Sequence, residues 1–311
     1  MKKSLLILSL SFFIALCQYS CQQESIIPTE TVDEENGDND DNHGVEQTGT
    51  GSANTSYPST AIVIKNAVKD IEGNIYDAVQ IGNQIWMAEN LRTSHYADGT
   101  YITTGISDAT TPGKIPPGSI DNVPKYGYLY NWPAVMHNSA SSESNPSGVQ
   151  GICPNGWHVP SLAEMEQLIA YMKSNPQYAA SGISDHIAKA MVTTWGWDAF
   201  EGWGYDPVDY PGTDMSTNNA SGFSVPAAGY YGVVPTGNPS SGAYTSNYWG
   251  KGRDAHIWST TQYAGKDSYY LVLSKQSETA AIDYSHDYAG YFSYGAPGNQ
   301  RYGFSVRCIK N

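Results

Sequence analysis

The stretch 195–205, WGWDAFEGWGY, places aromatic rings, glycines and carboxylates side by side, and these residue types can bind a sugar. An exposed indole ring stacks on the apolar face of a sugar, and a nearby carboxylate accepts the protons of its hydroxyl groups. Aromatic rings also form the core of loop-rich domains with few aliphatic side chains, and that alternative stays open. The candidate ligand-binding residues of this region are Trp197, Trp203, Tyr205, Asp206 and Asp209.

The same region offers oxygen ligands for a cation. Asp206, Asp209 and Asp214 lie close together in the sequence, and Asn218 and Asn219 follow. Carboxylate and amide oxygens in a flexible loop suit Ca²⁺. A solvated acidic loop built from Asx turns explains the same residues without a metal. We take Asp206, Asp209 and Asp214 as a candidate calcium site and expect no other cofactor.

A second aromatic cluster lies near the C-terminus, where residues 284–302 contain five tyrosines. Tyrosine offers rigid contact area and a polar tip at a low entropy cost. Half-buried strands and loops use tyrosine in the same way, so a structural role is the alternative. From this cluster we take Tyr291 and Tyr294 as candidate ligand contacts.

Residues arranged for catalysis are scarce. Ser285, His286 and Asp287 are adjacent in the sequence, and adjacent side chains cannot face one another as a catalytic triad requires. The sequence has no G-x-S-x-G, H-E-x-x-H or phosphate-binding glycine motif. We expect His158 to satisfy a loop carbonyl rather than to act as a base. The protein is therefore predicted to be non-catalytic, although a glycosidase with a carboxylate pair would need no local motif.

The first residues predict export. Two lysines precede an apolar run, Leu5–Leu16, which suits a signal peptide and is too short to span a bilayer. The segment Gln18–Cys21 ends with a small residue before a cysteine, as bacterial lipoprotein signals do. We expect residues 1–20 to be removed and Cys21 to carry the lipid that anchors the chain to a membrane. Cleavage nearby, with Cys21 unmodified, is the alternative.

Residues 21–60, which begin with Cys21, are predicted to form an acidic, disordered linker. Residues 22–60 contain nine acidic side chains and no Lys or Arg. Such a stretch buries too little apolar surface to offset its chain entropy, and its self-repulsion extends it. Residues 61–311 then hold 21 acidic and 14 basic residues, within a chain of formal charge −14. This balance argues against a nucleic-acid partner.

Residues 61–311 are predicted to form one α+β domain with long loops. The runs 75–81 and 84–88 alternate around a Gly82-Asn83 turn, which predicts a β-hairpin. Ser161 and Glu164 form a capping box before apolar residues at helical spacing, and this helix should end before Pro176. A weaker helix is expected over 184–192, and further strands are expected over 257–261, 268–274, 280–284 and 302–309.

Two cysteines, Cys153 and Cys308, are left in the mature domain if Cys21 carries lipid. An exported chain allows oxidation, so we expect a disulfide between them. Because it would span half the chain, this bond favours one domain over two. Two buried free thiols are the alternative.

Several sequence blocks together resemble a known family. They are VKDIEGNIYDAVQIGNQIWMAENL at 68–91, YGYLYNW at 126–132, GICPNGWHVPSLAEME at 151–166, SGFSVPAAGY at 221–230, IWSTT at 257–261 and GFSVRC at 303–308. In this order they resemble the Fibrobacter succinogenes major paralogous domain, FISUMP. The resemblance covers residues 68–310, nearly the whole predicted domain.

The resemblance implies a C-type-lectin-like fold, with a twisted, mostly antiparallel sheet, one or two helices and long loops. It also implies the disulfide from Cys153 to Cys308. Members are commonly lipoproteins of Gram-negative, Bacteroidetes-type bacteria, so we expect the outer membrane as the location, with the domain either at the cell surface or on the periplasmic face. The carboxylate motifs with which C-type lectins bind calcium and sugar are missing: Asn145-Pro146-Ser147 and Asn238-Pro239-Ser240 stand in place of Glu-Pro-Asn.

These observations favour a lectin-like binding module for a glycan or an envelope-protein ligand, anchored to a membrane by its lipid. A structural or adhesive component of the envelope is one alternative. A glycan-active hydrolase is the other, because its carboxylates can lie anywhere in the sequence.

Overall fold

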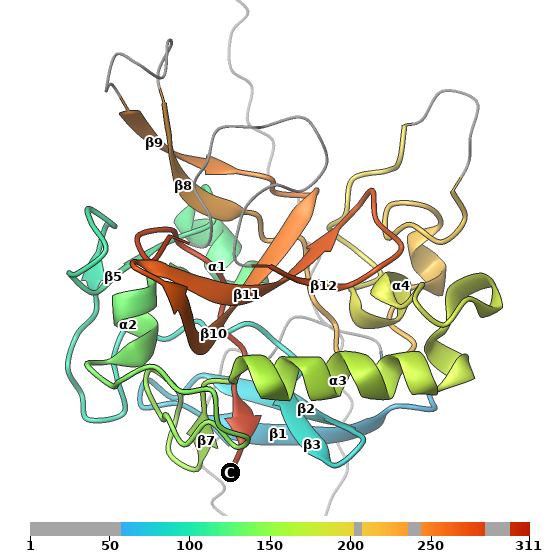
Figure 1. Ribbon diagram of the computed structural model, residues 1–311, viewed down its shortest axis with the longest axis horizontal. Coiled ribbons are helices and arrows are strands. Elements are labelled where there is room, and N and C mark those ends of the chain that lie inside the picture. Colours follow the sequence, from blue (N-terminus) through green and yellow to red (C-terminus); the bar gives the residue numbers. More distant parts are fainter. Residues whose placement is uncertain (1–56, 202–206, 236–243, 284–298) are drawn as a thin grey trace, which may run out of the picture. The chain divides into compact units, whose positions relative to one another are not determined.

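The computed structural model describes residues 57–201, 207–235, 244–283 and 299–311 (Figure 1). These residues belong to one structural unit, Thr48–Asn311. Within the described ranges, no helix combines the length and the apolar character needed to cross a membrane. The predicted lipidation site at Cys21 and the predicted linker before residue 57 lie outside the described residues.

Strands dominate the described chain. Its helices are α1 Val123–Tyr126, α2 Trp132–Met136, α3 Leu162–Ser174 and α4 Ala188–Met191, with short 3-10 turns at Ile120–Asn122, Pro176–Tyr178, Ala180–Gly182 and Met215–Thr217. Its strands are β1 Ile62–Lys69, β2 Ile75–Ile81, β3 Gln84–Met87, β4 Thr103–Thr104, β5 Gly113–Ile115, β6 Leu129–Tyr130, β7 Trp157–His158, β8 Tyr230–Pro235, β9 Tyr244–Trp249, β10 Asp254–Ala264, β11 Asp267–Ser274, β12 Ala281–Asp283 and β13 Ile309–Lys310.

The strands form one larger sheet and three small ones. The larger sheet has the order β1-β2-β3-β13-β7, so the last described strand is inserted between β3 and β7, which come much earlier in the chain. The small sheets are β10-β11-β12, β4-β5-β6 and the β8-β9 hairpin. Among the described pairs, only β4 and β5 run parallel. The α+β class with a mostly antiparallel sheet is thus confirmed.

The predicted hairpin is β2 and β3. Val79 pairs with Trp86 in its register, and both side chains are fully buried. Gly82 opens the turn with φ +63°, a left-handed conformation that glycine adopts without strain. A Cβ atom there would lie 2.9 Å from the ring of Tyr171 on α3. Glycine therefore both makes the turn and lets α3 pack against it.

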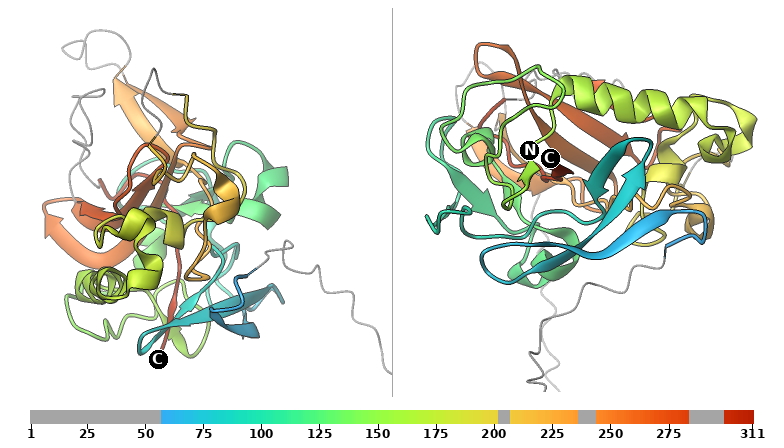
Figure 2. Two further views of the ribbon diagram at one scale, coloured as in Figure 1. Left: turned by 90° about the vertical axis from the view of Figure 1, so that its right-hand side faces the viewer. Right: turned by 90° about the horizontal axis from the view of Figure 1, so that it is seen from below.

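Helix α3 confirms the predicted capping box. The Ser161 side chain accepts the backbone N–H of Glu164, and the Glu164 side chain accepts the N–H of Ser161. Met165, Leu168 and Met172 are buried between the larger sheet and the β10-β11-β12 sheet, and the helix is seen beside both in Figures 1 and 2. The apolar stripe therefore joins the two sheets through one core.

Two predicted elements are shorter than expected. The weaker helix is reduced to α4, although its predicted inward residues Ile187, Ala188 and Met191 are fully buried. The predicted last strand, 302–309, becomes a two-residue strand preceded by single bridges. Gly303 bridges to residue 231, Phe304 to residue 130 and Ser305 to residue 257. The segment passes between several elements and shares its hydrogen bonds among them, so it does not form one long ladder.

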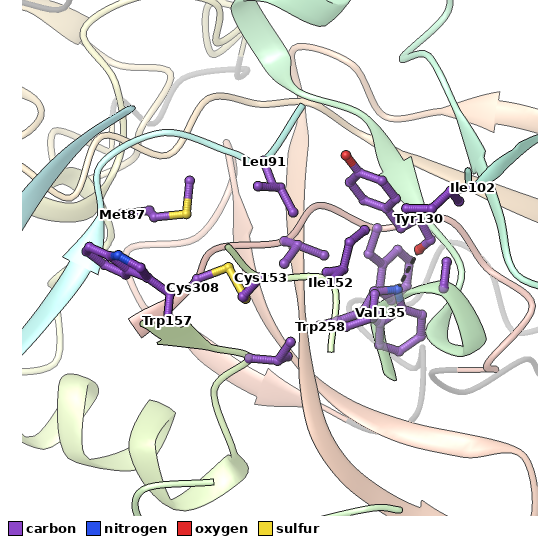
Figure 3. Packing of buried hydrophobic residues seen from close by; sticks show 14 of the residues in the cluster. Met87, Leu91, Ile102, Tyr130, Val135, Ile152, Cys153, Trp157, Trp258 and Cys308 are labelled. Atoms are coloured by element: carbon purple, nitrogen blue, oxygen red, sulfur yellow. Dashed lines mark hydrogen bonds between the residues drawn. A yellow bond between two sulfur atoms is a disulfide. The ribbon is translucent and has the colours of Figure 1, made fainter. Parts of the chain in front are cut away.

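The predicted disulfide joins Cys153 and Cys308, which are 155 residues apart in sequence with Cα atoms 6.0 Å apart. Both sulfurs are buried beside Met87, Leu91 and Trp157, as Figure 3 shows. The bond ties the segment before β7 to the start of β13. The crosslink therefore lies inside a hydrophobic core that also contains Tyr130, Trp258 and Phe304.

Replacing both Cys153 and Cys308 by Ala should lower the free energy of unfolding by about 4–5 kcal/mol, because the unfolded chain then regains the entropy of a long loop. Urea denaturation of the oxidised chain and of the double variant measures the difference. A loss below about 1 kcal/mol would show that this crosslink adds little to the contacts around it.

A buried ionisable pair supports the start of α3. The Nε2 atom of His158 lies 2.7 Å from Glu164, and its Nδ1 atom lies 2.7 Å from the side chain of Asn311. The prediction that His158 bonds to a loop carbonyl is therefore wrong, because its ring lies between a carboxylate and an amide oxygen. Burial lowers the pKa of His158, but the hydrogen bond and the charge of Glu164 outweigh it, so the pKa is raised overall.

Because the pKa of His158 is raised on folding, the charged pair should stabilise the fold fully below about pH 6.5, where the unfolded ring is also protonated. That stabilisation should be lost as the pH rises through the folded-state pKa. Thermal or urea unfolding between pH 5 and pH 9, roughly the range around this titration, measures it in the wild type and in His158→Gln. The stability gap between the two proteins should shrink with rising pH; a gap that is constant or grows would contradict the pair.

Candidate functional site

A surface pocket of about 230 Å³ lies beside Arg92. We call it the Arg92 pocket. Its wall combines a carboxylate, an amide, a guanidinium and a hydroxyl with an aromatic ring and two aliphatic side chains: Glu72, Asn74, Arg92, Ser94, Val123, Pro124 and Tyr128. These residues come from the β1–β2 turn, the loop after β3, and α1 with the segment that follows it.

A smaller hollow of about 20 Å³ adjoins it and shares Arg92 and Pro124 with its wall. We call this the inner hollow. The rest of its wall comes from the loop after β3, the end of α1, the ring of Trp195, the loop before β8 and the segment before β13. These residues are Ala88, Glu89, Asn90, Lys125, Gly127, Trp195, Ser224, Pro226 and Arg307. A space of this volume holds about one water molecule.

The β1–β2 turn is fixed by Asp70. Its carboxylate accepts the backbone N–H groups of Glu72 and Asn74 at 3.0 and 2.9 Å, and also the side-chain amide of Asn74 at 2.8 Å. The hydroxyl of Tyr76 donates to the same carboxylate at 2.6 Å. Asp70 is buried, so four donors compensate the desolvation of its charge. Glu72 and Asn74 are therefore held in place before any ligand arrives.

Arg92 is held as firmly. Its guanidinium bonds to Glu89 at 2.9 Å and to the carbonyl of Ile75 at 2.7 Å, and it lies 4.2 Å above the ring of Tyr76. The Tyr76 hydroxyl also accepts the backbone N–H of Arg92. Burial, followed by the charge of Asp70, raises the pKa of Tyr76 well above its usual value, so the phenol keeps its proton and donates it. The guanidinium is thus oriented by a ring, a carboxylate and a carbonyl.

Glu72 closes the outer edge of the pocket. Its carboxylate accepts the N–H of Ser94 at 2.7 Å and lies 2.5 Å from the Nδ1 atom of His95. The ring of His95 in turn contacts Tyr101, with centroids 5.2 Å apart. The hydroxyl of Ser94 makes no hydrogen bond in the described part of the chain, and it lines the pocket. This hydroxyl can therefore donate to a ligand or accept from it.

The loop after β3 is tied to α1 by a close approach. Gly127 has φ +77°, and a Cβ atom there would lie 2.6 Å from the carbonyl of Leu91. Asn90 donates to the carbonyl of Tyr126 at 2.9 Å and accepts from the buried Arg307 at 2.8 Å. Any side chain at position 127 would push α1 away from this loop. The two walls of the pocket are therefore fixed relative to each other.

Lys125 and Trp195 form the open side of the inner hollow. The Nζ atom of Lys125 lies 4.3 Å above the half-buried ring of Trp195, and the edge of that ring packs against Tyr126. Such a cation–π contact is worth about 0.5–1 kcal/mol at an exposed site. Lys125 is exposed and has no carboxylate partner in the described ranges, so its ammonium stays accessible.

The predicted sugar-binding indole of Trp197 is not exposed. Its side chain is 3 % exposed, lies in the hydrophobic core that α3 shares with the two sheets, and donates to the carbonyl of Val225 at 3.3 Å. The prediction of an exposed ring is therefore wrong at this residue, and the alternative of a packing role holds. Trp195, two positions earlier, is the tryptophan that reaches a pocket. The other predicted ligand contacts, Trp203, Tyr205, Asp206, Tyr291 and Tyr294, lie outside the described residues.

The predicted calcium ligands that can be placed have other partners. Asp209 accepts from Ser181 at 2.6 Å and lies 2.6 Å from His186. Burial alone would raise the pKa of Asp209. The two hydrogen bonds lower that pKa by more than burial raises it, so the pKa lies below its usual value. The Asp214 carboxylate accepts the hydroxyl of Ser216. Within the described ranges, no three His, Cys, Asp or Glu side chains group as a metal site would need.

A lysine provides positive charge in this loop. The buried Lys189 donates its ammonium to the carbonyls of Thr213 and Asp214, the second at 3.3 Å. A fixed ammonium at these two carbonyls repels a cation at Asp214. The sequence could not show this contact, because Lys189 is distant from the loop along the chain.

Comparison with family models supports the resemblance seen in the sequence. The model of the Fibrobacter succinogenes major domain (Fib_succ_major) matches residues 79–310. The chain belongs to this family. No curated protein and no solved structure matches the chain. Membership in the Fibrobacter succinogenes major domain family therefore covers the chain from the end of β2 to β13, and with it the pocket residues from Arg92 onward.

Sequence analysis missed the residues of the Arg92 pocket. Two of them, Glu72 and Asn74, lie in the block 68–91, as do Glu89 and Asn90 of the inner hollow, and Arg92 follows directly. Polar residues gathered in a turn and at a strand end were the available signal. The aromatic stretch 195–205 has an unusual composition, yet among its described residues only Trp195 lines these walls.

Asp70→Ala should lower the free energy of unfolding by about 3 kcal/mol, since it leaves the four donors of a buried site without an acceptor. Asp185→Ala is the matched control, because it removes only an exposed carboxylate paired with Lys173 and should cost less than about 1 kcal/mol. Urea denaturation compares the two. Equal losses would mean that Asp70 does not organise the turn.

Proposed function

We propose that this chain is an outer-membrane lipoprotein, lipidated at Cys21, whose domain is a non-catalytic, lectin-like module that binds a glycan at the cell envelope. The observation that carries the proposal is the Arg92 pocket, with its fixed hydrogen-bonding groups beside Tyr128. A protein ligand is the other ligand class that such a module could take, and the same pocket would then receive one of its side chains.

The chemistry of the wall suits a sugar. A sugar presents many hydroxyl groups around a ring whose faces carry C–H groups. Glu72 and the side-chain oxygen of Asn74 accept hydroxyl protons, Arg92 donates to hydroxyl oxygens, and Ser94 can do either. Tyr128, Val123 and Pro124 supply the apolar contact. Because Asp70 and Glu89 already hold several of these groups, binding costs little side-chain entropy.

The two carboxylates of the site favour binding over hydrolysis. Glu72 is engaged by Ser94 and His95, and Glu89 is engaged by Arg92 and the backbone N–H of Asp77. A glycosidase needs one carboxyl group that delivers a proton and a second that attacks or activates water. Here both carboxylates accept hydrogen bonds that position the wall. These bonds support a recognition role.

A C-type-lectin-like fold is part of the proposal. It is supported by a mostly antiparallel sheet that contains both the first and the last strand of the domain, and by a disulfide that reaches the start of that last strand. It is supported further by long connections between short elements. We propose that calcium is not needed for binding, because the Lys189 ammonium already bonds the loop carbonyls near Asp214.

Tyr128→Ala should weaken glycan binding about tenfold, because it removes an aromatic wall of the pocket. Ser94→Ala, which removes a hydroxyl without another partner, should weaken it less. The full chain is tested on a glycan array, and titration calorimetry is then done with the best glycan, with and without EDTA. EDTA should leave the affinity unchanged.

Tyr171→Ala is the control, since Tyr171 is a partly exposed tyrosine on α3 that does not line the pocket. Its binding should match that of the wild type. An array without any bound glycan would refute the glycan proposal. Binding that Tyr128→Ala leaves unchanged would place the site elsewhere on the domain.

A further inference from the structure

We infer that the glycan bound in the Arg92 pocket is acidic, and that one carboxylate oxygen of a uronic-acid-type sugar enters the inner hollow between Lys125 and Arg307. This inference rests on the proposed function and specifies its ligand class. It follows from the distribution of charge around the two cavities, from the size of the inner hollow and from the composition of the domain.

The charges around the cavities are unequally compensated. One carboxylate lines each cavity. Glu89 of the inner hollow bonds to Arg92 at 2.9 Å, and Glu72 of the Arg92 pocket contacts His95 at 2.5 Å. Lys125 and Arg307 form no ion pair within the described residues. The wall of the inner hollow thus carries three cations and one carboxylate. Two positive charges are left for a ligand to balance.

Arg307 provides the deeper of these charges. Its guanidinium is fully buried and donates to Asn90 and to the carbonyls of Met87, Phe223 and Ser224, all of them uncharged acceptors. Burial lowers its pKa to about 9, with the charges of Tyr57 and Glu89 acting in the opposite direction. It is therefore protonated at neutral pH. Neutral dipoles solvate this charge but do not cancel it, so its field reaches the hollow that it lines.

Lys125 provides the accessible charge, and a second lysine lies near it. The Nζ atom of Lys251 lies 5.2 Å above the ring of Tyr126, and Lys125 approaches the same ring at 5.8 Å. The acids on this side are Asp198, whose charge raises the pKa of Tyr126 after burial does, and Asp121, next to the residue that binds Lys251. Both carboxylates are exposed, so solvent and salt screen them more than they screen the buried Arg307.

The size of the inner hollow restricts what can enter. At about 20 Å³ it accommodates one oxygen atom with its hydration contacts, and it does not admit a sugar ring. The ring must stay in the Arg92 pocket, which is about ten times larger in volume and shares the Arg92 and Pro124 wall. A carboxylate on the sugar ring is small enough to reach across that wall. It would receive a charge-assisted hydrogen bond from Lys125.

Composition does not explain this positive site. Residues 61–311 hold 21 acidic and 14 basic residues, so a randomly chosen patch of the domain is more often negative. Cations that collect at one pair of cavities run against this excess. A neutral glycan would leave them without a counter-charge, whereas an acidic glycan would supply it.

The test uses the full chain and two matched probes: oligogalacturonides, and the same oligosaccharides after reduction of their carboxyl groups to alcohols. Titration calorimetry at low and at physiological salt measures both affinities. The acidic probe should bind at least about tenfold more tightly than the reduced probe, and this advantage should shrink as salt is added. Lys125→Gln should remove most of the advantage by weakening the binding of the acidic probe.

Lys173→Gln is the control, because Lys173 lies on α3 and pairs with Asp185 away from both cavities. It should bind like the wild type. Equal affinity for the two probes, or an advantage that survives Lys125→Gln, would overturn the acidic ligand and leave the glycan proposal standing. If neither probe binds and the array shows only neutral glycans, the acidic ligand is overturned as well. An array without any glycan would refute both.

Discussion

Arg307 is fully buried, and its guanidinium donates to four oxygen atoms, none of which carries a full negative charge. The fold has to bring those acceptors together from distant parts of the chain. Asn90 and Met87 come from the end of β3, and residues 223 and 224 come from a separate loop. Leaving a charge in a protein interior without such partners costs several kcal/mol, about as much as a domain's whole stability. The neighbouring disulfide at Cys308 holds the same segment covalently. The C-terminal segment therefore fixes the loop from which the candidate site is built.

Hydrogen bonds connect that loop to the candidate site and hold the residues of the site in place. Asn90 joins Arg307 to the end of α1, and Arg92 follows two positions later. On the other side, Asp70 fixes the β1–β2 turn, and Tyr76 links Asp70 to the backbone of Arg92. The pocket wall is thus part of the same polar network as the buried charge. A ligand meets groups that are already oriented, which lowers the entropy cost of binding.

Local structure could be predicted from the sequence, and the candidate site could not. The capping box at Ser161 and the hairpin turn at Gly82 depend on neighbours within a few residues, so their patterns are visible in the chain itself. The disulfide was predicted because exported cysteines have few chemical alternatives. The Arg92 pocket, by contrast, depends on contacts such as Asn90 with Arg307, 217 residues apart. Nothing local distinguishes Trp195, which reaches a cavity, from Trp197, which is buried.

The domain has a net negative charge, whereas the site has a net positive charge. Which of the two a ligand experiences depends on its distance from each charge. At physiological salt, charges separated by more than about 8 Å are largely screened. The excess of acidic residues over the domain therefore has little influence inside the cavities, where Lys125 and Arg307 act at contact range. Outside, the same acidic excess slows the approach of anions to the rest of the surface. An acidic ligand would then bind where its carboxylate meets these two cations and weakly elsewhere. The negative charge of the domain would thus confine an acidic ligand to this one site.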